Sequence, residues 1–148
     1  MFTLSGIKTV GRVVDVYDGD TMTCIFPIFG DNYFRFNLRL MGIDTPELKN
    51  KDMISKEKAL EARHKIMTVC CDNKYNLSKD CKRENIKKYL EENEINVWIE
   101  CLDFDKYGRI LANVYPKRGD NNVNIDSLTK ILLDANLGYE YNGGKKNN

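Results

Sequence analysis

The stretch that most constrains this chain runs from residue 34 to residue 47. Apolar and polar side chains alternate through most of it, as in a β-strand with one buried face. Pro46 then ends the strand, because proline has no backbone N–H to donate to a neighbour. Asp44 and Glu47 are therefore expected where a stiff strand becomes a loop, with Arg39 further back on the same strand. Two carboxylates and a guanidinium held in this way can form a reaction site, and they can also be an ordinary solvated strand end.

Four further stretches have the period-two pattern of strands and are separated by turn signals. Asp18-Gly19-Asp20 follows the first of them, and Gly30-Asp31-Asn32 precedes the third strand. The turn before the last strand is Asp105-Lys106-Tyr107-Gly108-Arg109. The first third of the chain is therefore expected to form a three-stranded meander. The predicted strands cover residues 10–17, 21–26, 34–43, 95–102 and 110–115.

Two segments have helical periodicity. In the first, Ser55 is the expected N-cap, and a mostly apolar stripe should pack on the sheet. The second is expected to begin near Asn124, to carry apolar residues at helical spacing from Leu128 onward and to stop at Gly138. The residues of the first stripe are Ala59, Ala62, Arg63, Ile66 and Cys70.

Residues 72–94 are dense in charge, and a short helix is expected around Arg83 to Glu92 with only a thin apolar face. We interpret this segment as a surface insertion. From Tyr139 onward the chain is too polar and Gly-rich for a packed element, and residues 142–148 are interpreted as a flexible tail. The whole pattern predicts one α+β domain over residues 1–148: a five-stranded OB-fold β-barrel with two main packed helices and a short helical insertion.

Composition places the chain among ordinary globular domains. At 148 residues it suits a single core. The formal net charge is +1, so any affinity for phosphate must come from a local cluster of cations. No signal-peptide pattern and no apolar run long enough to span a bilayer is present, which predicts an intracellular protein without membrane contact. The five cysteines, an odd number without framework spacing, fit reduced thiols.

Asp20 and Asp44 are candidate ligands of a cation. Asp20 opens the second strand and Asp44 closes the third, so adjacent strands can bring both carboxylates together. Close carboxylates repel unless a proton or a cation joins them, and hard oxygen ligands suit Ca²⁺ or Mg²⁺. The single His and the Asp18-Gly19-Asp20-Thr21 pattern fit neither a zinc triad nor an EF-hand. The alternative is that Asp18 and Asp20 are simply turn residues, which is common for aspartate.

Arg39 and Arg109 can form a clamp for phosphate oxygens, because the planar guanidinium binds them in a bidentate way. A pair of surface salt bridges is the alternative. Glu47 can act as a general base on water if it lies beside a cation and an arginine, and otherwise it is an exposed loop carboxylate. We expect no catalytic role for His64, and we interpret Cys70-Cys71 as buried helix cysteines and not as a metal site.

Three blocks of the chain, in this order, resemble the staphylococcal nuclease (thermonuclease) family. They are Asp18-Gly19-Asp20-Thr21, Arg39 through Asp44-Thr45-Pro46-Glu47, and Asp105-Lys106-Tyr107-Gly108-Arg109 with Leu111-Ala112 behind it. The likeness extends over most of the chain apart from residues 72–94. It implies an OB-fold barrel and a calcium-dependent endonuclease, a phosphodiesterase that acts on DNA and RNA and leaves a 3′-phosphate and a free 5′-hydroxyl.

The resemblance also implies how a cation would be held and how water would be activated. Asp20 and Asp44 match the carboxylate ligands of calcium, and Thr45 matches the ligand that uses its backbone carbonyl. Glu47 matches the residue to which activation of water is assigned. Calcium is therefore the expected cofactor.

A second group of matching residues concerns the substrate. Arg39 and Arg109 match the two phosphate-binding arginines. Lys106, Tyr107 and Tyr141 match groups that contact the phosphates and the sugar or base of a nucleotide. Nucleic acid is therefore the expected partner, and we expect the chain to act as a monomer.

Three classes of function fit these observations. The leading hypothesis is a metal-dependent nuclease, and the alternative is a non-catalytic nucleic-acid- or protein-binding module on the same barrel. A purely structural interaction domain is the third. Non-catalytic binding modules usually lack part of the polar set, whereas this chain retains all of it. The retained residues are Asp20, Arg39, Asp44, Glu47 and Arg109.

Overall fold

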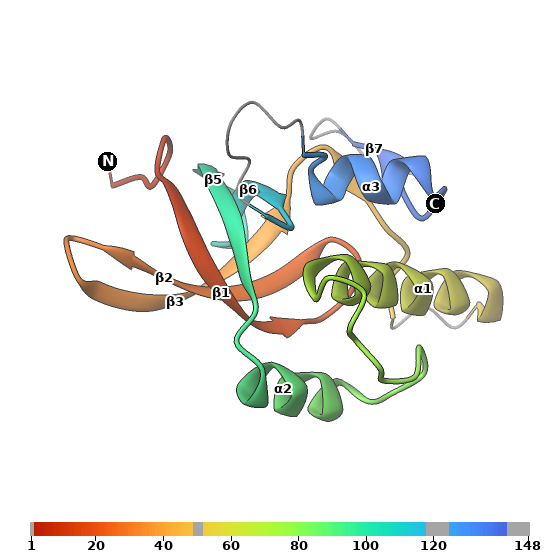
Figure 1. Cartoon of the computed structure of the whole chain (residues 1–148). Coiled ribbons are helices and arrows are strands. Elements are labelled where there is room, and N and C mark those ends of the chain that lie inside the picture. Colours follow the sequence, from red (N-terminus) through yellow and green to blue (C-terminus); the bar gives the residue numbers. More distant parts are fainter. Residues whose placement is uncertain (1, 49–51, 118–124, 142–148) are drawn as a thin grey trace.

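The main feature of the computed structural model, which describes residues 2–48, 52–117 and 125–141, is a closed barrel. Its strands follow one another in the order β1-β2-β3-β6-β5 (Figure 1). Neighbouring strands are antiparallel except β3 and β6, which run parallel. This confirms the predicted α+β class and the five-stranded OB-fold barrel. The barrel strands are β1 (Lys8–Val16), β2 (Thr21–Ile28), β3 (Asn32–Leu40), β5 (Asn96–Phe104) and β6 (Ile110–Tyr115).

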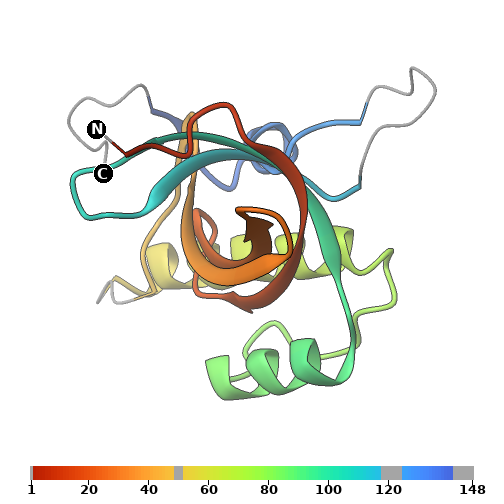
Figure 2. The same ribbon diagram turned by 90° about the vertical axis from the view of Figure 1, so that its left-hand side faces the viewer.

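The barrel interior is filled by alternate residues of each strand, as the period-two pattern requires. In β2, for example, Met22, Cys24 and Phe26 are fully buried, while the residues between them are half-buried. Figure 2 looks at the barrel from the tip of the β2–β3 hairpin and shows the strands curling around this core. The outward-facing residues are therefore those available to form a site.

In the described part of the chain, three helices accompany the barrel: α1 (Met53–Cys70), α2 (Arg83–Glu92) and α3 (Leu128–Asp134). Helix α1 lies across the end of the barrel opposite the hairpin tip, and α2 lies beside β1 (Figure 1). None of the helices in the described ranges has the length and apolar character needed to cross a bilayer. Four of the five predicted stripe residues of α1 are buried, but Cys70 is only half-buried and Met67, which was not predicted, is buried instead.

Both main helices begin at a residue other than the predicted one. The N-cap of α1 is Asp52, whose Oδ1 accepts the Ile54 N–H (3.3 Å) while its Oδ2 accepts the Ser55 hydroxyl (2.9 Å). Ser55 therefore lies inside the first turn. Helix α3 is capped by Ser127, which accepts the Lys130 N–H (3.1 Å). The start predicted near Asn124 was too early, and Asn124 itself lies outside the described residues.

The third strand ends earlier than its alternating pattern predicts. β3 stops at Leu40, and Gly42 has a φ of 86° that reverses the chain before β4 (Ile43–Asp44). β4 pairs with β7 (Tyr139–Glu140), so the prediction that no packed element follows Tyr139 was wrong. The tail predicted over residues 142–148 lies outside the described residues.

The helix predicted between Arg83 and Glu92 is confirmed as α2. Its apolar face is thin, but Ile86 and Leu90 are fully buried and belong to the main hydrophobic core. Arg12 of β1 closes the end of the helix, because its Nη2 donates to the carbonyls of Leu90 (3.1 Å) and Glu91 (3.2 Å). This segment is thus bound to the barrel by core packing as well as by polar contacts.

Candidate active site

The β1–β2 turn and the end of β3 meet on the outer surface of the barrel. Thr21 pairs with Arg39 across β2 and β3, and the Leu40 N–H donates to the Asp20 backbone carbonyl (2.9 Å). The Thr45 N–H then donates to Oδ2 of Asp20 (3.0 Å). Pairing between β2 and β3 therefore brings Asp20, at the start of β2, beside the loop that follows β3.

Arg39 lies between the two predicted metal ligands. Its guanidinium is 3.5 Å from Oδ2 of Asp20 and 3.3 Å from Oδ1 of Asp44. It also donates to the backbone carbonyls of Leu40 (3.1 Å) and Ile43 (2.8 Å). The side chain is only 9% exposed. These contacts fix the guanidinium in one place, so it is preorganised for an anion that approaches the same surface.

Negative charge is concentrated around this guanidinium. Asp18, Asp20 and Asp44 are each at most 5% exposed. The Asp20 N–H donates to Oδ1 of Asp18 (3.2 Å). Burial, followed by the proximity of Asp20, raises the pKa of Asp18 to about 7, although Arg39 acts in the opposite direction. Carboxylates crowded in this way are stabilised by a bound cation, which offsets their mutual repulsion.

The donor chemistry fits a hard cation. Asp20 and Asp44 offer carboxylate oxygens and Thr45 offers a backbone carbonyl, which are the ligand types that calcium prefers. The Thr45 hydroxyl oxygen is buried and makes no hydrogen bond with any described residue. Within the described ranges, no three acidic, thiol or imidazole side chains converge on one point. An ion held here would therefore complete its shell with carbonyl oxygens and water.

The second predicted phosphate ligand, Arg109, is held by the turn between β5 and β6. Oδ1 of Asp105 accepts the N–H groups of Tyr107 and Arg109 (both 2.9 Å), and its Oδ2 accepts Nε of Arg109 (2.7 Å). Burial opposes ionisation of Asp105, but these hydrogen bonds outweigh it and lower its pKa. Nη1 of Arg109 donates to the Thr21 hydroxyl (3.4 Å), which donates to Oδ1 of Asp20 (3.1 Å). Thr21 therefore links the second arginine to the acidic cluster.

Aromatic rings lie next to both arginines. The ring of Tyr107, a residue 72% exposed, has the Arg109 guanidinium 5.5 Å and the Lys106 ammonium 5.2 Å from its centroid. The Tyr141 ring lies 5.6 Å from the Arg39 guanidinium carbon. The structure thus brings the three predicted substrate-contact residues to the two arginines.

Glu47, the predicted base, lies on the loop that carries the metal-ligand candidates. It follows Pro46 and is exposed, whereas Asp44 and Thr45 on the same loop are buried. Proline stiffens the backbone between these positions by fixing φ. The Glu47 carboxylate therefore has access to water two residues along the chain from Thr45.

Comparison with known proteins identifies the family. The family model described as Staphylococcal nuclease homologue matches residues 37–130, which is more than half of the chain. The chain belongs to this family. Membership indicates a nuclease-like module associated with nucleic acid. A search of curated proteins finds no match. Of the predicted site residues, the matched range contains Arg39, Asp44, Thr45, Glu47, Lys106, Tyr107 and Arg109, and it leaves out Asp20 and Tyr141.

Three residues contribute to the site of this nuclease homologue in ways that the sequence analysis did not assign. Asp105 orients Arg109, Thr21 joins that arginine to the acidic cluster, and Gly19 allows the β1–β2 turn to approach α1. The signal for Asp105 was an aspartate at the start of a tight turn that ends in arginine, a position where its carboxylate commonly accepts backbone N–H groups. The other two depend on contacts between distant segments.

Helix α2 of this nuclease homologue supports the strand that leads into the acidic turn. Nε of Arg83 donates to Oδ2 of Asp15 (2.9 Å), and Lys87 is 3.9 Å from the same oxygen. The Arg83 guanidinium also lies 4.7 Å from the centroid of the Tyr17 ring. Asp15 is buried and Tyr17 directly precedes Asp18, so α2 restrains β1 close to the candidate cation site.

A mutation at Gly19 tests how tightly the turn must pack. A Cβ added there would lie 2.6 Å from Cβ of Ala62 and 2.8 Å from Cγ2 of Thr45. We expect Gly19→Ala to lower the free energy of unfolding by about 1–3 kcal/mol, because α1 or the turn must move. Urea unfolding monitored by Trp98 fluorescence measures this. Gly6→Ala is the control: its Cβ meets nothing within 4 Å and its φ is +93°, so any loss of stability there comes from backbone strain and not from packing. A Gly19→Ala protein as stable as wild type contradicts the packing argument.

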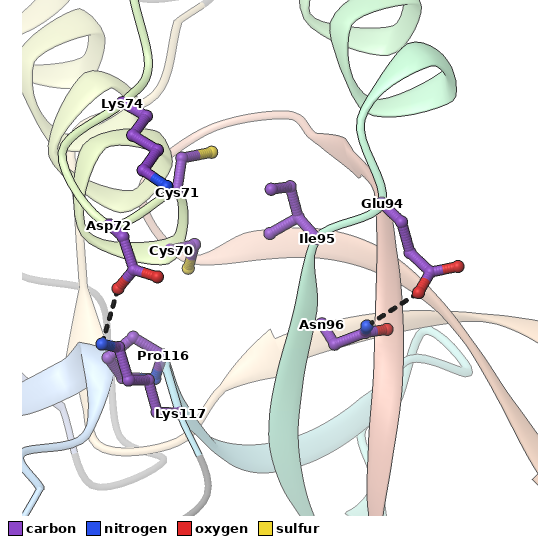
Figure 3. Close-up of a pocket in the computed structure, with 9 residues that line it drawn as sticks. All are labelled: Cys70, Cys71, Asp72, Lys74, Glu94, Ile95, Asn96, Pro116 and Lys117. Carbon is purple, nitrogen blue, oxygen red and sulfur yellow. Dashed lines mark hydrogen bonds and ion pairs between the residues drawn. The ribbon is translucent and has the colours of Figure 1, made fainter.

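A pocket of about 410 Å³ lies elsewhere on the molecule and has none of these site residues in its wall (Figure 3). Burial raises the pKa of the Cys70 and Cys71 thiols, so both are protonated and unreactive near neutral pH. Asp72 at its edge is paired with Lys117 (2.6 Å). The pocket therefore presents no activated nucleophile. Its lining residues are Cys70, Cys71, Asp72, Lys74, Glu94, Ile95, Asn96, Pro116 and Lys117.

Proposed function

We propose that this chain is a calcium-dependent endonuclease that hydrolyses phosphodiester bonds of DNA or RNA and leaves 3′-phosphate ends. The observation that carries the proposal is the acidic cluster in which Arg39 lies between Asp20 and Asp44, while Thr21 links Arg109 to the same cluster. Two guanidinium groups can stabilise negative charge on a phosphate, paired carboxylates can hold a cation, and an exposed neighbouring carboxylate can act as a base.

The arginines bind the scissile phosphate. A phosphodiester is anionic, and further negative charge develops on its non-bridging oxygens in the transition state. Arg109 has a side chain 30% exposed and can rotate its guanidinium face toward the substrate, whereas Arg39 is fixed by its carbonyl contacts. Calcium, when bound by Asp20, Asp44 and the Thr45 carbonyl, would supply a further positive charge that polarises the phosphate. The preorganised donors stabilise the transition state more than the ground state.

Glu47 acts as the base in this proposal. Its carboxylate accepts a proton from water as the water oxygen forms a bond to phosphorus, and the bond from phosphorus to the 5′-oxygen breaks. The departing 5′-oxygen takes a proton from solvent and becomes a hydroxyl. Lys106, Tyr107 and Tyr141 are proposed to contact the nucleotide on either side of the phosphate. Tyr107 and Tyr141 lie against Arg109 and Arg39, and Lys106 lies against the Tyr107 ring.

The test is cleavage of a labelled single-stranded oligonucleotide by the full chain, with calcium or with a chelator. We expect cleavage only with calcium, and products whose 3′ ends block extension by a polymerase until a phosphatase has removed the phosphate. Arg109→Ala should lower kcat by about 10²–10³-fold, as for loss of one preorganised donor. Lys58→Ala, which removes an exposed cation of α1, is the control.

Cleavage that is equal with calcium and with chelator, or equal in Arg109→Ala and wild type, would overturn the proposal. Binding of the oligonucleotide without cleavage in any sample would instead support a non-catalytic binding module on the same barrel.

A further inference from the structure

The outer face of the β2–β3 hairpin continues the candidate site away from the acidic cluster. Alternate residues of a strand point to the same side, so the face that carries Arg39 also carries every second residue before it. Leu38 and Leu40 are buried in the core, so Arg39 and the alternate residues before it lie on the outer side of the barrel. This face, here called the hairpin face, consists of Tyr33, Arg35, Asn37 and Arg39 on β3, opposite Pro27, Ile25, Thr23 and Thr21 on β2.

Arg35 differs from the other arginines. It is exposed and makes no hydrogen bond or ion pair with any described residue. Every other arginine in the described ranges is held by a carboxylate or by backbone carbonyls. Those residues are Arg12, Arg39, Arg63, Arg83 and Arg109. A guanidinium without an internal partner is available to an external anion.

The composition of the hairpin face also favours an anionic chain. None of its eight positions is acidic, and Tyr33 at its outer end is 65% exposed. Thr23 and Asn37 form a hydrogen bond across the strands (2.9 Å), so the face is polar between Arg35 and Arg39. An exposed guanidinium next to an exposed ring suits a single strand, whose phosphates and unpaired bases are both accessible.

The β3 part of this face beyond Arg39 is open, because Tyr33, Arg35 and Asn37 are exposed while Arg39 itself is buried. β3 pairs with β6 only at residues 38–40, so residues 32–37 pair with β2 alone. Figure 1 shows the tip of the β2–β3 hairpin projecting away from α1 and α2. A second copy of the chain could in principle pair with this open edge of β3. Both copies would then carry Arg35 on the paired hairpins, and charges at a sheet edge disfavour such self-association.

We propose that the hairpin face binds the part of a single-stranded nucleic acid that extends beyond the scissile phosphate. This inference rests on the proposed function and names the form of its substrate. Successive residues of the face are about 6.6 Å apart along β3, a spacing comparable with one nucleotide step of an extended strand. Arg35 binds a flanking phosphate and Tyr33 stacks on a flanking base. The β2–β3 surface is also the one through which OB-folds in general bind oligonucleotides.

The test measures binding separately from cleavage. Fluorescence anisotropy in chelator follows a single strand of about 12 nucleotides, within the site size of OB-folds, as DNA and as RNA. We expect Arg35→Ala to weaken binding about fivefold to tenfold and to lower the slope of log affinity against log salt by about 0.7, the contribution of one single-strand phosphate. Tyr33→Ala should weaken binding at least about fivefold through loss of stacking. Tyr33→Phe retains the ring and Lys58→Ala lies on α1, so both should bind like wild type.

In the calcium assay, Arg35→Ala and Tyr33→Ala should raise KM for the long strand and leave kcat unchanged. A dinucleotide that spans only the scissile phosphate should be cleaved with wild-type KM, because it does not reach these residues. If wild type binds but never cleaves and both variants still weaken binding, the proposed catalysis fails while the hairpin-face inference stands. Unchanged affinity and salt slope in both variants would overturn the hairpin-face inference. Absence of single-strand binding by wild type, or an equal loss of affinity for a duplex, would also overturn it.

Discussion

Replacing Arg39 with alanine is expected to lower kcat by at least about 10³-fold and the free energy of unfolding by about 3–5 kcal/mol. The guanidinium is almost fully buried and lies within 3.5 Å of carboxylates of Asp20 and Asp44. Its removal leaves these buried charges without their counter-charge, and it leaves the carbonyl of Ile43 without a donor. Single-turnover cleavage in calcium measures the first effect, and urea unfolding in chelator measures the second.

Two comparisons separate charge from geometry at this position. Arg39→Lys retains the positive charge but not the planar fork, so it should recover part of the stability and little of the activity. Adding calcium should stabilise Arg39→Ala against urea, because a cation bound by Asp20 and Asp44 offsets the same repulsion. If Arg39→Ala unfolds at the wild-type urea concentration, the buried cluster is not held together by this arginine.

Much of the fold was predictable because it depends on local patterns. Alternating residues identified all five barrel strands, and the β6 bounds Ile110–Tyr115 agree with the prediction. The errors arose where a distant partner decides the structure. β4 and β7 exist because Ile43 and Asp44 pair with Glu140 and Tyr139, residues almost a hundred positions away. A two-residue strand is too short to show the alternation of buried and exposed side chains that identifies a strand in a sequence.

The candidate site shows the same division. Its charged groups were identified because they lie in short blocks whose turns and strand ends can be read locally. The contacts that organise them were not, because each joins two blocks. The Thr21 hydroxyl accepts a hydrogen bond from Arg109, which lies in a turn 88 positions away. Likewise, the alternating pattern places Arg35 and Arg39 on one face, but only the structure shows that Arg39 is buried among carboxylates while Arg35 has no described partner.

Glu47→Gln should lower kcat by about 10²–10⁴-fold, the usual contribution of a general base. The substitution preserves the size of the side chain and removes its ability to accept the proton of attacking water. Because Glu47 is exposed, the free energy of unfolding should remain within about 0.5 kcal/mol of wild type. Affinity for a long single strand, measured in chelator, should also be unchanged or slightly higher, because a negative charge has been removed. The measurement is single-turnover cleavage at saturating substrate.

Glu61→Gln removes the same charge from the exposed surface of α1 and serves as the control, with wild-type kcat expected. A variant that retains the wild-type kcat would show that another group activates the water.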